Sequence, residues 1–308
     1  MKTGFALSLW LSASLTMLAC GCASPGAVTS DAQTPSVPQG RLPEGVRPLR
    51  YALELTIIPE QERFSGVAEI SLELDAPTDG FWLHGQNLRV SQLYIDTGAA
   101  RVPGTWEQRT DDGLVRLTFP ETIPAGKATL KVAYEAEFNQ ELRGLYRVEV
   151  GENAYAFTQF EATSARSAFP SFDEPRFKTT FDVALTVPKT AVAAANTPAA
   201  RSVGLPGELR RVQYLTTPPL PTYLLAWAVG PFDVVEAEPL PANEVREQTI
   251  PFRGLAVRGQ GQKLQYALEH TAAFVAALEA YFGIPYPYRK LDIVAVPDFA
   301  AGAMENVG

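Results

Sequence analysis

The segment KATLKVAYEAEF, residues 127–138, places an apolar side chain at every second position. A period of two is typical of a β-strand with one face buried and the other in water. The same alternation recurs in residues 51–59 and 67–74. Further strands are expected at residues 88–96, 114–119, 181–187 and 223–229. Residues 43–238 are therefore predicted to form an antiparallel β domain, either sandwich-like or saddle-shaped.

The charge balance is acidic, with 26 Lys and Arg against 34 Asp and Glu among 308 residues. This length suggests about two domains. With no basic patch to meet a phosphate backbone, a nucleic-acid partner is not expected, whereas a cationic ligand would suit the balance. Only two histidines occur, His84 and His270, far apart in the chain. A catalytic zinc site usually takes three protein ligands, so no zinc site is recognisable in this chain.

The first 22 residues are typical of a secretory signal, with Lys2 ahead of an apolar run that reaches Ala19. The run is too short for a comfortable membrane-spanning helix. Cys20, in the context CGCAS, resembles the acylated cysteine of a bacterial lipoprotein, with Cys22 as the alternative anchor. A plain secretory signal with incidental cysteines is the other interpretation. We expect an exported protein of the bacterial cell envelope, anchored to the membrane and facing the periplasm or exterior, with residues 23–42 as a flexible tether.

The pattern changes after residue 238. A short strand is expected at residues 250–257, a helix at 260–282 and an apolar strand at 291–297. One helix face, predicted to be buried, carries Leu264, Leu268, Thr271, Val275, Leu278 and Phe282. A helix and two strands do not complete a domain, so residues 239–308 are expected to be the incomplete beginning of a second one.

Two stretches carry carboxylates without an evident partner nearby in sequence. Gln159 and Glu161 end the strand TQFE on one face, and such a pair often faces a cleft. Glu305 lies in PDFAAGAMENVG, among small residues that allow another backbone to approach closely. A solvated loop is the alternative for Glu305. The charges of Arg166 and Asp173 between these stretches are expected to fix a loop rather than to do chemistry.

These stretches resemble the aminopeptidase N-like zinc metalloaminopeptidases. The resemblance covers roughly residues 43–308 and is carried by TQFEATSARSAFPSFDEPRFKTTF, PTYLLAWAVGPF and YFGIPYPYRKLDIVAVPDFAAGAMENVG. It implies a mainly β fold followed by the start of a thermolysin-like α+β catalytic domain. It also implies that Glu161 and Glu305, with Gln159 alongside, hold the free amino group of a peptide. Gly302, Ala303 and Met304 would present backbone groups and an apolar wall to the first substrate residues.

The resemblance further implies zinc in the complete protein, held by a His-Glu-x-x-His helix that would follow residue 308. This chain is expected to bind no metal and to be inactive as a peptidase by itself, because it supplies only recognition of the substrate amino terminus. Two alternatives stay open. One is a non-catalytic, membrane-anchored β module for peptide or partner binding. The other is a generic β-sandwich in which both glutamate motifs are coincidental.

Overall fold

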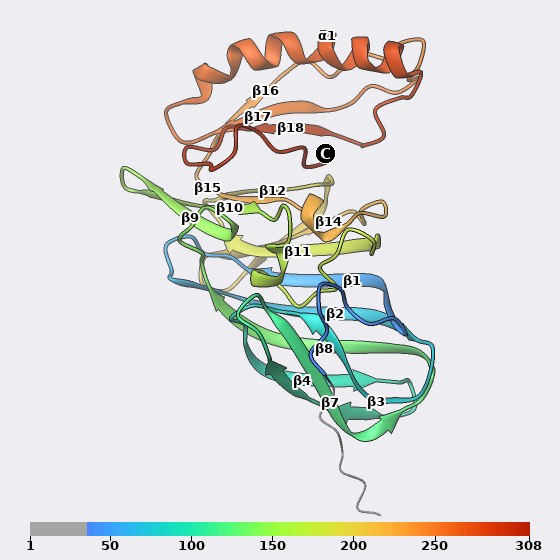
Figure 1. Cartoon of the computed structure of the whole chain (residues 1–308). Coiled ribbons are helices and arrows are strands. Elements are labelled where there is room, and N and C mark those ends of the chain that lie inside the picture. The colour runs from blue at the N-terminus through green and yellow to red at the C-terminus, as the bar shows by residue number, and fades with distance from the viewer. Residues whose placement is uncertain (1–35) are drawn as a thin grey trace, which may run out of the picture. The chain divides into compact units, whose positions relative to one another are not determined.

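The computed structural model describes residues 36–308 (Figure 1). The predicted signal, both cysteines and most of the predicted tether lie outside the described residues. At the start of the described part, Leu42 is already buried, and its backbone N–H donates to Glu174. None of the helices in this part is long and apolar enough to cross a membrane.

The largest sheet has eight strands and contains the alternating segments found in the sequence. Its order is β13 (Ala199–Leu205), β14 (Leu209–Tyr214), β11 (Thr180–Pro188), β1 (Val46–Thr56), β2 (Arg63–Leu74), β8 (Gly126–Glu137), β4 (Arg89–Asp96) and β5 (Arg101–Pro103). The alternating apolar residues are buried as predicted: Tyr51, Leu53 and Leu55 on β1 are at most 2% exposed. One pairing departs from the predicted antiparallel arrangement, because β1 and β11 run parallel, with Arg50 opposite Thr180.

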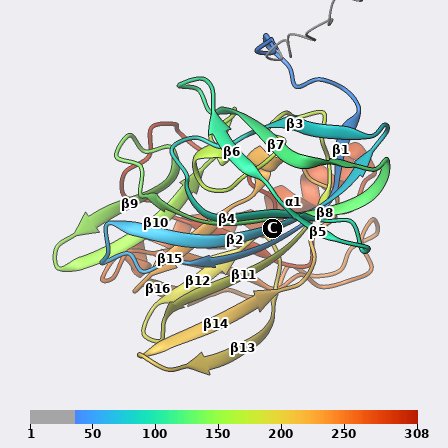
Figure 2. The ribbon, with the colours of Figure 1, turned by 90° about the horizontal axis from the view of Figure 1, so that it is seen from below.

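Two smaller sheets complete the β domain. The first, with order β3 (Thr78–His84), β7 (Leu114–Ile123) and β6 (Thr105–Gln108), lies on the near side in Figure 2. The second has the order β12 (Val192–Ala195), β15 (Trp227–Gly230), β10 (Asn153–Gln159) and β9 (Gly144–Val150). Within the large sheet, the buried ring of Tyr51 on β1 stacks on that of Phe181 on the neighbouring β11, with ring centroids 4.8 Å apart. The predicted mainly β fold is confirmed.

The strand predicted at residues 223–229 is only partly correct. The short 3₁₀ helix η2 (Thr222–Leu224) occupies its first half, and β15 begins only at Trp227. The backbone turns here because the N–H of Leu224 donates to the carbonyl of Pro221. The apolar composition of this stretch suited a strand, but a local turn sets its conformation.

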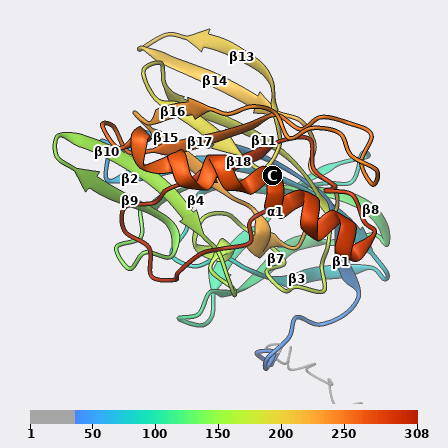
Figure 3. The same cartoon turned by 90° about the horizontal axis from the view of Figure 1, so that it is seen from above.

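The remaining residues form a small α/β unit. Its sheet has the order β16 (Asp233–Glu236), β17 (Phe252–Ala256) and β18 (Leu291–Val294), and β17 and β18 are parallel. The connection between the parallel strands runs through η3 (Gly261–Leu264) and α1 (Gln265–Phe282), and α1 lies over the sheet (Figure 3). The strand–helix–strand order predicted for this region is confirmed.

The predicted buried stripe of the helix is wrong at its C-terminal end. Leu264 is buried and Leu268 packs on the cluster of Leu240, Ile250 and Phe252, but Leu278 and Phe282 are 56% and 62% exposed. The short strands β17 and β18 offer apolar contacts only to the first turns of α1.

In the last turns of α1 the buried residue is Glu279, which is 3% exposed. Its carboxylate accepts from Arg246 at 2.7 Å, from Asn243 at 2.6 Å and from the N–H of Tyr286 at 2.7 Å. Burial opposes ionisation of Glu279, but these hydrogen bonds outweigh it and lower its pKa. A charged network therefore replaces the expected apolar contact.

Candidate functional site

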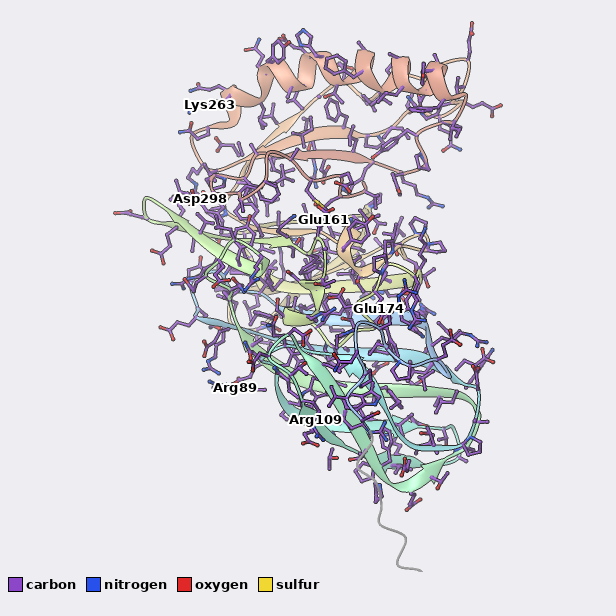
Figure 4. The ribbon with its side chains drawn as sticks, in the orientation of Figure 1. Arg89, Arg109, Glu161, Glu174, Lys263 and Asp298 are labelled. Atoms are coloured by element: carbon purple, nitrogen blue, oxygen red, sulfur yellow. The ribbon has the colours of Figure 1, made fainter. Side chains whose placement is uncertain are left out.

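Gln159 and Glu161 lie where β10 ends. Gln159 is the last residue of the strand, and its side chain is 8% exposed. The next residue begins a turn in which the N–H of Ser164 donates to the carbonyl of Phe160, so Glu161 leaves the sheet and is exposed. The Glu161–Ala162 peptide bond is cis. Figure 4 shows Glu161 on the side of the β domain that faces the C-terminal residues.

The segment of residues 295–308 follows β18 and crosses the four-stranded sheet. Val296 packs against the buried cluster that contains Tyr146 and Phe157. The hydroxyl of Tyr146 also donates to the carbonyl of Asp298 at 3.2 Å. Because Tyr146 and Phe157 lie on β9 and β10, this packing brings residues 302–308, hereafter the GAMEN segment, to the strand end that carries Gln159.

The two predicted motifs meet at one contact. Nε2 of Gln159 lies 3.6 Å from the sulfur of Met304. Met304 is half-buried, whereas the predicted site residues beside it, Gly302, Ala303 and Glu305, are exposed. Glu161 lies two residues after Gln159, and Glu305 lies one residue after Met304. The contact therefore joins the segments that carry the two glutamates.

The carboxylates of Glu161 and Glu305 are available to bind a ligand. Among residues 36–308, no ion pair or side-chain hydrogen bond involves Glu161 or Glu305. Oε1 of Gln159 is also buried without a hydrogen-bond partner within the same residues. A buried acceptor normally finds a donor, so an unpaired one where the segments of the two glutamates meet favours a ligand that brings N–H groups. The arrangement suits a small cation with several donors.

Two asparagines, to which the sequence patterns assigned no role, hold the GAMEN segment. Asn196, directly after β12, donates to the carbonyl of Val307 at 2.8 Å. Asn306 donates to the carbonyls of Leu224 and Leu225 at 3.3 and 3.4 Å. In the sequence, Asn196 stands before Thr-Pro at a strand end and is typical of a turn, so its distant partner leaves no local signal.

The charged loop after Glu161 is held by a buried ion pair. Arg166 and Asp173 form an ion pair of 3.0 Å with side chains 9% and 1% exposed. The backbone N–H of Asp173 donates to Nδ1 of His84 at 3.2 Å. Burial lowers the pKa of His84 to about 3, and the charge of Arg166 acts in the same direction, so the ring is neutral at pH 7.

The residues that the structure describes do not fit a zinc ion. No group of three His, Cys, Asp or Glu side chains in this part of the chain could hold a metal. His84 is bound to the loop of Asp173, and His270 stacks on Tyr266 with ring centroids 4.1 Å apart.

Comparison with known protein families shows which family this chain belongs to. Residues 47–224, more than half of the chain, match the peptidase M1 N-terminal domain. The chain belongs to the peptidase M1 family. Residues 266–308 match the peptidase family M1 domain, and this range contains β18, the GAMEN segment and all but the first residue of α1. The family expected from TQFE and GAMEN is confirmed.

Several curated M1 relatives are similar over most of this chain. Aminopeptidase M1-B of Oryza sativa subsp. japonica is 37% identical over 88% of this chain and 30% of its own length. The puromycin-sensitive aminopeptidase of Caenorhabditis elegans is 34% identical over 87% and 28%, respectively. Aminopeptidase N of Acetobacter pasteurianus is 31% identical over 87% of this chain and 74% of its own length. This chain spans about a third of the length of the first relatives it matches.

Proposed function

We propose that the protein is an M1 aminopeptidase that removes single residues from the free amino end of peptides, and that this chain supplies recognition of that end. The observation that carries the proposal is the contact of Gln159 with Met304. It brings together two segments whose glutamates are exposed and make no ion pair or side-chain hydrogen bond within residues 36–308. The names of the M1 relatives support the same class of reaction.

The substrate amino group matches what these residues offer. A peptide α-ammonium has a pKa near 8 and carries three N–H donors at neutral pH. Glu161, Glu305 and the buried Oε1 of Gln159 are three acceptors. One unit charge pair at about 4 Å is worth roughly 4 kcal/mol at an effective dielectric constant of about 20, before desolvation.

The same acceptors give exopeptidase selectivity. An acylated or internal peptide segment brings no ammonium, so it cannot form charge-assisted hydrogen bonds to the two carboxylates. The exposed backbone at Gly302 and Ala303 is free to pair with the first substrate residues in the manner of an added strand. Selection for a free amino end then follows from charge and hydrogen bonding.

Peptide-bond cleavage in this family depends on zinc, which activates the attacking water when it is bound. We place that ion outside residues 36–308. The function of these residues is to bind the substrate amino end and to orient the peptide. The alternative of a non-catalytic peptide-binding module would use the same glutamates.

We also propose that Cys20, or alternatively Cys22, carries a lipid that anchors the protein to the bacterial cell envelope. Expression in a bacterium followed by mass spectrometry of the amino-terminal peptide tests this proposal. A lipid-sized mass increase that Cys20→Ala abolishes would support Cys20. An unmodified cysteine would contradict the anchor.

Calorimetric titration with trialanine and N-acetyl-trialanine tests the recognition proposal. The chain should bind the free-amine peptide and not the acetylated one. Glu161→Gln and Glu305→Gln should each weaken trialanine binding by about tenfold or more. Glu152→Gln is the matched control, because this exposed glutamate lies in the turn at the other end of β10. Unchanged affinity in Glu305→Gln would reject the assignment.

A further inference from the structure

The buried side-chain amide of Asn196 makes three hydrogen bonds. Its side chain, 4% exposed, donates through Nδ2 to the carbonyls of Leu224 at 2.9 Å and Val307 at 2.8 Å. Oδ1 accepts from the N–H of Ala226 at 2.8 Å. An amide has two N–H donors and one acceptor oxygen, so only this orientation satisfies all three partners.

These partners belong to two separate segments. Val307 lies two residues after Glu305, whereas Leu224 and Ala226 lead into β15. Asn306 reinforces the link because it also donates to the carbonyl of Leu224, at 3.3 Å. The GAMEN backbone is therefore fastened to the start of β15 by two amides.

The same loop is fastened to the strand that ends at Gln159. The N–H of Trp227 donates to Oγ1 of Thr158 at 2.9 Å, and Thr158 is the residue before Gln159. β10 and β15 are neighbours in the sheet, with Phe157 opposite Ala228. A series of buried and partly buried hydrogen bonds thus links Val307, through Asn196, to the strand end that carries the TQFE motif.

We propose that Asn196 is a positioning residue of the amine site, the proposed ammonium-binding site of Gln159, Glu161 and Glu305. Asn196 fixes the position of the Glu305 backbone relative to the end of β10. The inference rests on the proposed function. An ammonium shared between two carboxylates requires both to lie within hydrogen-bond reach at once, and a displacement of about 1 Å is enough to lose much of that benefit. A fully satisfied buried amide supplies the rigidity.

Two substitutions separate the bonds of Asn196. Asn196→Asp keeps an acceptor for the N–H of Ala226 but turns the two donations to carbonyls into oxygen–oxygen repulsion. Asn196→Ala removes all three bonds and buries no charge, so it remains informative if the aspartate variant does not fold. Asn153→Asp is the matched control, since this half-buried asparagine at the start of β10 makes no side-chain hydrogen bond within the described residues.

The readouts are the trialanine dissociation constant, measured well below the melting temperature of every variant, and amide hydrogen exchange. Asn196→Asp and Asn196→Ala should weaken trialanine binding about tenfold, and Asn153→Asp should not. Exchange of the Asp292 amide, which donates to the carbonyl of Gly308 at 3.1 Å, should speed up in both Asn196 variants. The Ala226 amide should stay protected only in Asn196→Asp. A purely structural role would lower the melting temperature and leave the affinity of the folded protein unchanged.

Glu305→Gln in the same titration distinguishes failure of the positioning role from failure of the proposed function. If Glu305→Gln weakens binding and both Asn196 variants bind like the parent chain, the positioning role is wrong and the amine site stands. If Glu305→Gln also binds like the parent chain, the proposed function itself fails. Unchanged exchange of the Asp292 amide in both Asn196 variants would overturn the positioning role whatever the affinities are.

Discussion

Nε2 of Gln159 lies 3.6 Å from the sulfur of Met304, although 145 positions separate the two residues. The amide and the thioether make a weak hydrogen bond, so the contact owes its persistence to the packing around it. Val296 and Tyr146 supply that packing on the same side of the sheet. The pair marks where the end of β10 meets the GAMEN segment.

If Glu161 and Glu305 bind one ammonium, their contributions should be coupled. A double-mutant cycle with Glu161→Gln, Glu305→Gln and the double variant should give an interaction energy of about 0.5–3 kcal/mol for trialanine binding. Titration calorimetry supplies the four dissociation constants. Strict additivity would show that the two carboxylates do not share a cation.

Loss of Asp173 should strongly destabilise the β domain. Asp173→Ala leaves the buried guanidinium of Arg166 without its ion pair, at a cost of about 3–5 kcal/mol in the free energy of unfolding. Arg89→Ala is the control, because Arg89 is 60% exposed in its pairs with Glu135 and Glu137 and should cost at most about 1 kcal/mol. Urea denaturation measures both, and equal losses would refute the structural role of the Arg166 loop.

His84 should make the stability depend on pH. Its pKa is about 3 in the folded chain, whereas the unfolded imidazole titrates near 6.5. Below pH 6.5 the unfolded state takes up a proton that the folded state refuses. The free energy of unfolding therefore falls as the pH drops towards 3, by up to about 1.4 kcal/mol per pH unit.

His84→Asn isolates this contribution, because the asparagine oxygen can accept the N–H of Asp173 and does not titrate. Urea midpoints measured between pH 7 and 4 should fall less steeply for the variant than for the parent chain. Identical slopes would mean that His84 takes up its proton without unfolding.

Burial along η3 and α1 predicts a contrast between two leucines. Leu264, 4% exposed, packs against Gly254, where an added Cβ would meet the leucine Cδ1 at 2.7 Å. Leu264→Ala should therefore lower the free energy of unfolding by about 2–5 kcal/mol. Leu278→Ala, at a position 56% exposed, should change it by at most about 0.5 kcal/mol. Thermal or urea unfolding of both variants provides the check. Similar losses of unfolding free energy would mean that the helix face is buried along its whole length, as the sequence predicted.

The chain of 308 residues should not hydrolyse aminoacyl anilides, even with added zinc. The expectation rests on its ligand set, since His84 and His270 are its only histidines and neither belongs to a His-Glu-x-x-His pattern. Release of 4-nitroaniline from leucine 4-nitroanilide is the measurement, with an M1 aminopeptidase as positive control. Zinc-dependent turnover by the purified chain would refute it.

The sequence predicted those features that local pattern encodes. Alternation located β1, β2 and β8, and the turn and helix signals located α1 to within a few residues. It could not predict that β1 pairs in parallel with β11, since alternation shows which face is buried and not which strand lies alongside. The exposed end of α1 was missed for a similar reason, because periodicity does not reveal how far the underlying sheet extends.

The candidate site divides in the same way. Motif resemblance located Gln159, Glu161 and the residues of GAMEN, and the structure joins the two motifs at Met304. Asn196 was missed because all that sets it apart is its contact with Val307, 111 positions away. Long-range side-chain contacts of this kind follow from the fold and leave no periodic trace in the sequence.

The parallel pairing of β1 with β11 also bears on the order in which the chain can fold. β2 follows β1 at once and can cover one of its edges as soon as both are made. The other edge waits for Thr180, because Arg50 pairs there. Until residue 188 has been synthesised, β1 therefore presents an open edge of unpaired backbone groups, which invites association with other nascent chains. Chaperone dependence during synthesis should be greatest over this interval.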